Sequence, residues 1–239
     1  MEILNSLRKL FKAKEPGKHP EGKALQKYSK FVFATIVEPL TPDERNKRYA
    51  DPLAAYLEEQ EIGVVTGGGT LLGDRAHPDE KDIINAGIDI ELANLDEALA
   101  LAKSKLIELG APFGSNIDYE NHEGKFLTEP IGELELLHVF IDNMNLSNEI
   151  YENTDTQSLY KAFDTALEGS TIGEARGSGA WKSETLIYFA GKSADEIFEK
   201  IEPLCTDFPI LQNARIVFQR KDKEKQPKEL RIPFNPDRS

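Results

Sequence analysis

Residues 63–73, GVVTGGGTLLG, and residues 173–181, GEARGSGAW, are glycine-punctuated segments at the same place in two halves of this 239-residue chain. Three glycines of the first segment recur 110 residues later: Gly63, Gly67 and Gly69 as Gly173, Gly177 and Gly179. Glycine inside a strand allows a β-bulge or the close approach of a neighbouring strand. Both segments are therefore expected to be irregular strands.

Strands and helices alternate around the first glycine segment. Strand composition and alternation mark residues 31–40, 88–92 and 115–119, and helical spacing of apolar residues marks 43–60 and 94–109. With the glycine segment, the predicted order is strand, helix, strand, strand, helix, strand.

The second half repeats this order. Strands are predicted at 134–141, 185–190 and 214–218, and helices at 156–167 and 193–204. The capping boxes also match, because Asn94 and Glu97 recur 99 residues later as Ser193 and Glu196. The difference in offset falls in a longer polar loop after Gly73.

The fold class expected from this repeat is α+β, with tandem ferredoxin-like βαββαβ repeats that form a pseudo-dimer. Four regions are predicted: a basic N-terminal helix and linker (1–30), a first unit (31–121), a second unit (131–219) and a basic flexible tail (220–239). In the first region, an apolar stripe at helical spacing accompanies basic residues: Ile3, Leu4, Leu7, Leu10 and Phe11, with Arg8, Lys9 and Lys12. This segment is either an arm docked on the body or a membrane-surface helix.

The charge is distributed unevenly along the chain. The formal net charge is −13, but residues 1–30 carry +5, residues 219–239 carry +3, and residues 31–218 carry −21. Such an acidic body argues against bulk nucleic-acid binding, which needs a basic face. The single cysteine, the lack of an apolar run long enough to span a membrane and the lack of a signal peptide lead us to expect a cytoplasmic protein.

Candidate binding residues fall into three groups. Asp89 and Glu91 share one face of a strand, and with Glu38 on the adjacent strand they could form a carboxylate cluster or a solvated outer face. The run from Gly67 through Gly68 and Gly69 to Thr70 superficially resembles a phosphate-binding loop. No Lys-Ser/Thr and no helix follow it, however, so the bulge interpretation is favoured.

The third group is Trp181 with Arg176, which form either a core anchor or an exposed recognition site. Cys205 is expected to be a buried apolar residue. The four histidines do not recur between the halves, and no Ser-His-Asp, Cys-His or zinc-site spacing is present. No catalytic residue, metal or cofactor is therefore predicted.

The segments GVVTGGGT, IDIEL and LDEALALAKSKLIELGAPFGS, with ETLIYFAGKSADEIFEKIEPL and FPILQNARIVF, resemble a family of uncharacterised bacterial proteins built from two such halves. The resemblance covers about residues 31–218 and carries no active site. A small acidic bacterial protein of this kind looks like an immunity protein or antitoxin.

The leading hypothesis is a non-enzymatic acidic binding protein that neutralises a basic protein partner, such as a toxin domain, since the charged body would steer that partner toward it. The first alternative is a small-ligand sensor or enzyme that uses the groove between the repeats. The second is a membrane-peripheral scaffold that docks through residues 1–14. The oligomeric state stays open.

Overall fold

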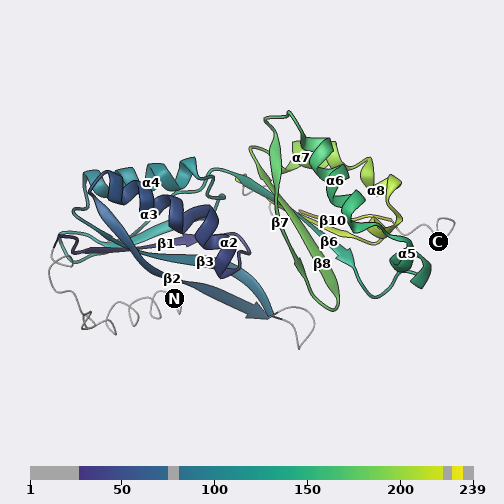
Figure 1. Cartoon of the computed structure of the whole chain (residues 1–239), viewed down its shortest axis with the longest axis horizontal. Helices are drawn as coiled ribbons and strands as arrows, with labels where there is room; N and C mark the ends of the chain where they lie inside the picture. Colours follow the sequence, from purple (N-terminus) through teal and green to yellow (C-terminus); the bar gives the residue numbers. More distant parts are fainter. Residues whose placement is uncertain (1–26, 75–80, 223–227, 234–239) are drawn as a thin grey trace.

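Two five-stranded antiparallel sheets, one in each half of the chain, organise the protein (Figure 1). The computed structural model describes residues 27–74, 81–222 and 228–233. Helices α3 and α4 cover one face of the first sheet, and α6 and α7 cover one face of the second. The α+β class is confirmed.

The first sheet has the strand order β2-β3-β1-β4-β5. Its elements are β1 (Lys30–Ile36), α2 (Pro42–Arg45), the π-helix η1 (Asn46–Ala50), α3 (Asp51–Glu59), β2 (Gly63–Asp74), β3 (Lys81–Leu92), α4 (Glu97–Glu108), β4 (Asn116–Glu120) and β5 (Phe126–Pro130).

The second sheet has the order β10-β9-β6-β8-β7. Its elements are β6 (Glu135–Asp142), α5 (Asn148–Asn153), α6 (Thr156–Leu167), β7 (Gly173–Ala180), β8 (Glu184–Gly191), α7 (Ala194–Ile201), α8 (Leu204–Asp207), the 3-10 helix η2 (Pro209–Leu211), β9 (Arg215–Gln219) and β10 (Lys228–Arg231).

The two glycine-rich strands are irregular at matching places. The pairing of β2 with β3 shifts register between Val65 and Gly67, and the pairing of β7 with β8 shifts between Ala175 and Gly177. The bulged residues are thus Thr66 and Arg176, which lie 110 positions apart in the sequence. The predicted β-bulges are confirmed.

The helix predicted over residues 43–60 is divided into three segments. Thr41 begins the first with a capping box, in which its side chain accepts from the Glu44 N–H and its N–H donates to the Glu44 carboxylate. A π turn follows, closed by the Asp51 N–H donating to the Asn46 carbonyl. Pro52 has no N–H for an ordinary helical bond, which accounts for the irregular turn before it.

Each sheet buries its core against its own helices. The first core contains the even-numbered residues of β1 with Leu53, Leu57 and Leu106, and the second contains Phe163, Ile197 and Phe218. A smaller apolar cluster of Phe140, Leu186 and Tyr188, with Trp181 and Val217 against it, lies on the second sheet apart from that core.

Several elements differ from the sequence prediction. The tail from residue 220 was expected to be flexible, but β10 pairs with β9, and Leu230 and Ile232 pack against the second core. The flanking prolines hid this four-residue strand. Strand β3 begins at Lys81 rather than Ile88, because its first residues pair only with β2 and show no burial pattern of a covered sheet. Strand β5 and helix α5 were not predicted.

Candidate functional site

The face of the first sheet that points away from the helices carries carboxylates around two phenylalanines. On β1, Val32, Ala34 and Ile36 are buried in the helix-covered core, so Phe31 and Phe33 lie on the opposite face. Phe33 is paired with Asp89 of β3 on one side and Asp118 of β4 on the other.

The same arrangement holds one row further along the sheet. Phe31 is paired with Glu91, and Glu120 lies level with it, because the preceding Tyr119 pairs with Val32. We call this surface the acidic aromatic face, and define it by Phe31, Phe33, Asp89, Glu91, Asp118 and Glu120. The outer positions of these two rows are Gly67 and Thr128 in one, and Val64 and Phe126 in the other. Within the described strands, neither row therefore contains a lysine or an arginine.

The carboxylates of this face differ in their surroundings. Asp89 and Glu91 are half-buried and Glu120 is exposed, whereas Asp118 is buried and accepts a hydrogen bond from the Thr128 hydroxyl. Burial raises the pKa of Asp118, against the hydrogen bond from Thr128. The prediction that Asp89 and Glu91 share a face opposite Ile88, Ile90 and Leu92 is confirmed by the complete burial of those three residues.

The glycine run beside this face serves the pairing of strands. A Cβ atom on Gly67 would lie 3.0 Å from Asp89 Oδ2, and one on Gly68 would lie 2.4 Å from the Gly87 carbonyl oxygen. Arg45 Nη1 donates to the Gly69 carbonyl at 3.1 Å, and Thr70 pairs with Ala86. These residues pair within the sheet, as the bulge interpretation predicts.

Glu38 does not join the other carboxylates, so the cluster of Glu38 with Asp89 and Glu91 was wrong. Glu38 continues the buried, even-numbered side of β1 and is 1% exposed. Its Oε2 accepts from the Tyr49 hydroxyl at 2.6 Å, and its Oε1 accepts from Arg48. Strand alternation places it under the helices, on the face opposite Asp89.

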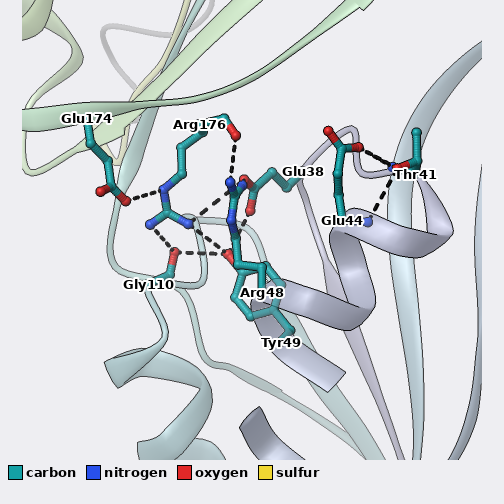
Figure 2. Close-up of polar contacts among 8 residues, drawn as sticks. All are labelled: Glu38, Thr41, Glu44, Arg48, Tyr49, Gly110, Glu174 and Arg176. Carbon is teal, nitrogen blue, oxygen red and sulfur yellow. Dashed lines mark hydrogen bonds and ion pairs between the residues drawn. The ribbon is translucent and has the colours of Figure 1, made fainter. Parts of the chain in front are cut away.

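Arg176 connects this buried carboxylate to the second half (Figure 2). Its Nη1 lies 3.9 Å from Glu38 Oε1 and donates to the Tyr49 hydroxyl at 3.3 Å. Its Nη2 donates to the Gly110 carbonyl at 3.3 Å, and its own carbonyl accepts from Arg48 Nη2 at 2.6 Å.

The fourth contact of Arg176 is an ion pair of its Nε with Glu174 Oε1, at 2.7 Å. We call Glu38, Arg48, Tyr49, Glu174 and Arg176 the junction cluster. The β7 bulge aims Arg176 at the first half, which is the re-aiming that bulges permit. Of the two roles predicted for Arg176, the structure therefore gives it the buried one.

Two tyrosines of this region are held in the neutral form. Burial, followed by the Glu38 carboxylate, raises the pKa of the Tyr49 phenol, against the charge of Arg176. The pKa of Tyr188 is raised by burial and then by Glu38, against the charge of Arg48. A neutral Tyr49 can donate to Glu38 at any physiological pH, so the cluster acts as a fixed joint between the halves.

Trp181 lies on the second sheet against Phe140, Leu186 and Tyr188. Its ring rests on β7, because a Cβ atom on Gly179 would lie 2.5 Å from Trp181 Cη2. The indole is half-buried. The core-anchor role predicted for Trp181 is the one that these contacts support.

Gly179→Ala should therefore lower the free energy of unfolding by about 1–3 kcal/mol, because the new methyl group displaces the Trp181 ring. The matched control is Gly69→Ala, at the corresponding position of the first half, where an added Cβ meets nothing within 4 Å. Urea denaturation followed by Trp181 fluorescence compares the two variants. Equal effects would show that the Trp181 contact does not matter.

His138 is a buried titratable group on β6. Its ring makes edge contacts with Phe140 and Tyr188, each with centroids 6.0 Å apart, and its Nε2 has no hydrogen-bond partner among the described residues. Burial, with the nearby charge of Arg215, lowers the pKa of His138 to about 4. Its protonation therefore disfavours the folded chain.

Because the unfolded chain binds this proton near pH 6.5 and the folded chain only near pH 4, His138 should make stability fall as the pH drops through that window. The loss is at most about 3 kcal/mol, at 1.36 kcal/mol for each pH unit. His138→Leu should remove this part of the pH dependence between pH 6.5 and 4, as measured by urea denaturation. An unchanged pH profile in the variant would rule out a role for His138.

The remaining candidates show no reactive centre. Burial, followed by the charge of Glu202, raises the pKa of the Cys205 thiol to about 11. Among the described residues, no group of three His, Cys, Asp or Glu side chains could hold a metal ion. No helix in the described ranges is both long enough and apolar enough to cross a membrane.

Two cavities lie in the second half. One, of about 360 Å³, lies between α5, the start of α6 and η2, and the other, of about 430 Å³, lies between α6 and α8. Neither is lined by Gly67–Thr70, Asp89 or Glu91, so neither supports a ligand groove at those residues.

Comparisons with known proteins show only weak similarity. No family model matches the chain, and no curated protein matches it. A chain from the crystal structure of TiaS in complex with a tRNA, AMPCPP and agmatine is 12% identical with a TM-score of 0.28, and the match covers 73% of this chain and 56% of that one. The present chain thus spans about half the length of that relative.

A putative Dyp-type peroxidase protein from Shewanella oneidensis is 10% identical with a TM-score of 0.25, and the match covers 72% of this chain and 82% of that one. Similarity at this level carries no argument about fold or function.

Proposed function

We propose that this chain is a non-enzymatic acidic binding protein that captures a basic protein partner, in the manner of an immunity protein or antitoxin, and that the partner binds the acidic aromatic face. The single observation that carries the proposal is the pairing of Phe33 with Asp89 and Asp118, repeated in the next row by Phe31 with Glu91 and Glu120.

The chemistry of this face suits a cationic partner. Aromatic rings supply apolar contact area, and the neighbouring carboxylates supply partners for lysine and arginine side chains. Arginine also stacks on aromatic faces, which two phenylalanines between carboxylates would favour. The charge of −21 over residues 31–218 adds long-range attraction.

We further propose that each half is a ferredoxin-like βαββαβ unit and that the chain is a tandem duplication forming a pseudo-dimer. Three observations support this: the strand orders β2-β3-β1-β4 and β7-β8-β6-β9, the helices that follow β1, β3, β6 and β8, and the two bulges 110 residues apart. In such a pair, the junction cluster would fix the orientation of the two units. The cytoplasmic location predicted from the sequence belongs to the same proposal.

Affinity capture with matched variants tests the proposed function. The face variant carries Asp89→Asn, Glu91→Gln, Asp118→Asn and Glu120→Gln, and the control variant carries Glu196→Gln, Glu199→Gln, Glu202→Gln and Asp207→Asn, which are exposed residues of the second half. Both raise the formal net charge of −13 by four. Each chain is immobilised and exposed to an extract of its source organism.

The expected result is one basic protein retained by the wild-type and control chains, and lost from the face variant. Loss from both variants alike would show that only net charge matters. A retained partner that is acidic, or one that the face variant still holds, would contradict the proposal.

A further inference from the structure

The described chain begins beside the acidic aromatic face. Ser29 N–H donates to the Leu92 carbonyl at 3.2 Å, and Lys27 Nζ lies 3.1 Å from Glu61 Oε2. The chain then enters β1, where Lys30 pairs with Leu92 and Phe31 with Glu91. The preceding residues are therefore attached at the end of the face where Glu91 lies.

The sequence of that preceding segment complements the face. Residues 1–14 contain four basic residues, Arg8, Lys9, Lys12 and Lys14, and one acidic residue, Glu2. The same residues carry the apolar stripe that ends in Leu10 and Phe11. A segment that combines apolar side chains with cationic ones is the occupant that a surface of phenylalanines and carboxylates would recognise.

The segment is also long enough to reach every part of the face. Twelve residues, 15–26, separate it from the described chain, and they span up to about 40 Å when extended. Strand β1, which carries both phenylalanines, has seven residues and extends about 23 Å. Pro16, Gly17, Pro20 and Gly22 make a helical linker unfavourable.

We propose that residues 1–14 of this chain dock on the acidic aromatic face and compete there with the basic partner. The docking stands on the face and the segment alone, and the competition rests on the proposed function. An attached arm acts at an effective concentration of about 1 mM. If the free segment binds with a dissociation constant of about 0.1 mM, the arm weakens any competitor at this face about tenfold.

A labelled peptide of residues 1–14 tests this proposal in fluorescence anisotropy with the full chain. The arm variant carries Arg8→Glu, Lys9→Glu and Lys12→Glu, which should release its own arm from the face. We expect the peptide to bind the arm variant about tenfold more tightly than the wild-type chain. A chain that combines the arm and face variants should bind the peptide weakly, which separates recognition of the face from general attraction to negative charge.

Equal affinity of the peptide for the wild-type chain and the arm variant would overturn the proposal. So would a peptide that binds vesicles of phosphatidylglycerol and phosphatidylcholine but not the chain, which would favour the membrane-surface helix. The basic partner is absent from this assay, so its failure leaves the capture experiment intact. Conversely, loss of the partner from the face variant does not depend on the arm.

Discussion

Glu38→Ala should lower the free energy of unfolding by about 3 kcal/mol, because it leaves the buried partners of Glu38 without their carboxylate. The Glu38 side chain is completely buried, while that of Arg48 is 26% exposed and can recover some hydration. Tyr49 would lose the acceptor for its hydroxyl, and Arg176 would lose the nearest carboxylate of the first half. Urea denaturation measures the loss.

The same experiment reports whether the cluster couples the two halves. Trp181 is the only tryptophan and lies in the second half, so its fluorescence follows that half, whereas far-UV circular dichroism follows both. We expect the two transitions to separate in Glu38→Ala. The control is Glu61→Ala, which removes a carboxylate whose side chain is 78% exposed and should cost less than about 1 kcal/mol. Equal losses in the two variants would contradict a structural role for the junction cluster.

The face variant should slow association with the purified basic partner by about 100-fold at low ionic strength, since steering by a charged surface accelerates encounter by roughly 10- to 1,000-fold. The acidic aromatic face contributes most to this field because its rows contain no lysine or arginine within the described strands. Stopped-flow measurements at about 50 mM salt compare the face and control variants, which have the same net charge.

Added salt gives an independent check of the same prediction. Raising the ionic strength to about 0.5 M should slow the wild-type and control chains toward the rate of the face variant, because exposed charges are screened over a few ångströms there. Equal rates for the face and control variants at low salt would show that the partner is steered by total charge, and the face would lose its special role.

The sequence predicted the elements that carry periodic or repeated signals. The glycines of 63–73 and 173–181 located both irregular strands, and the alternation of 88–92 placed Asp89 and Glu91 on the face away from the core. Phe31 and Phe33 could have been assigned to that face by the same alternation along β1. The pairing with Asp118 could not, because it depends on which strand lies beside β1.

The junction cluster was beyond the reach of sequence patterns. Arg48 and Tyr49 lie in a π turn that a regular helical pattern does not contain, and Arg176 occupies a bulge whose side chain leaves its own sheet. The contacts between Arg176 and Tyr49 join residues 127 positions apart. Glu38 was placed with the wrong carboxylates because its strand was considered without the turn that follows it.

Hydroxyl-radical footprinting of the chain with and without its purified basic partner tests the central claim most directly, because it reports the solvent access of individual side chains. Phe31 and Phe33 are half-buried in the free chain, and Met144, at 53% exposed, and Tyr160, at 38%, serve as references in the second half. We predict that the partner protects Phe31 and Phe33 from oxidation and leaves Met144 and Tyr160 unchanged. Protection of the reference residues, with Phe31 and Phe33 oxidised as before, would contradict it.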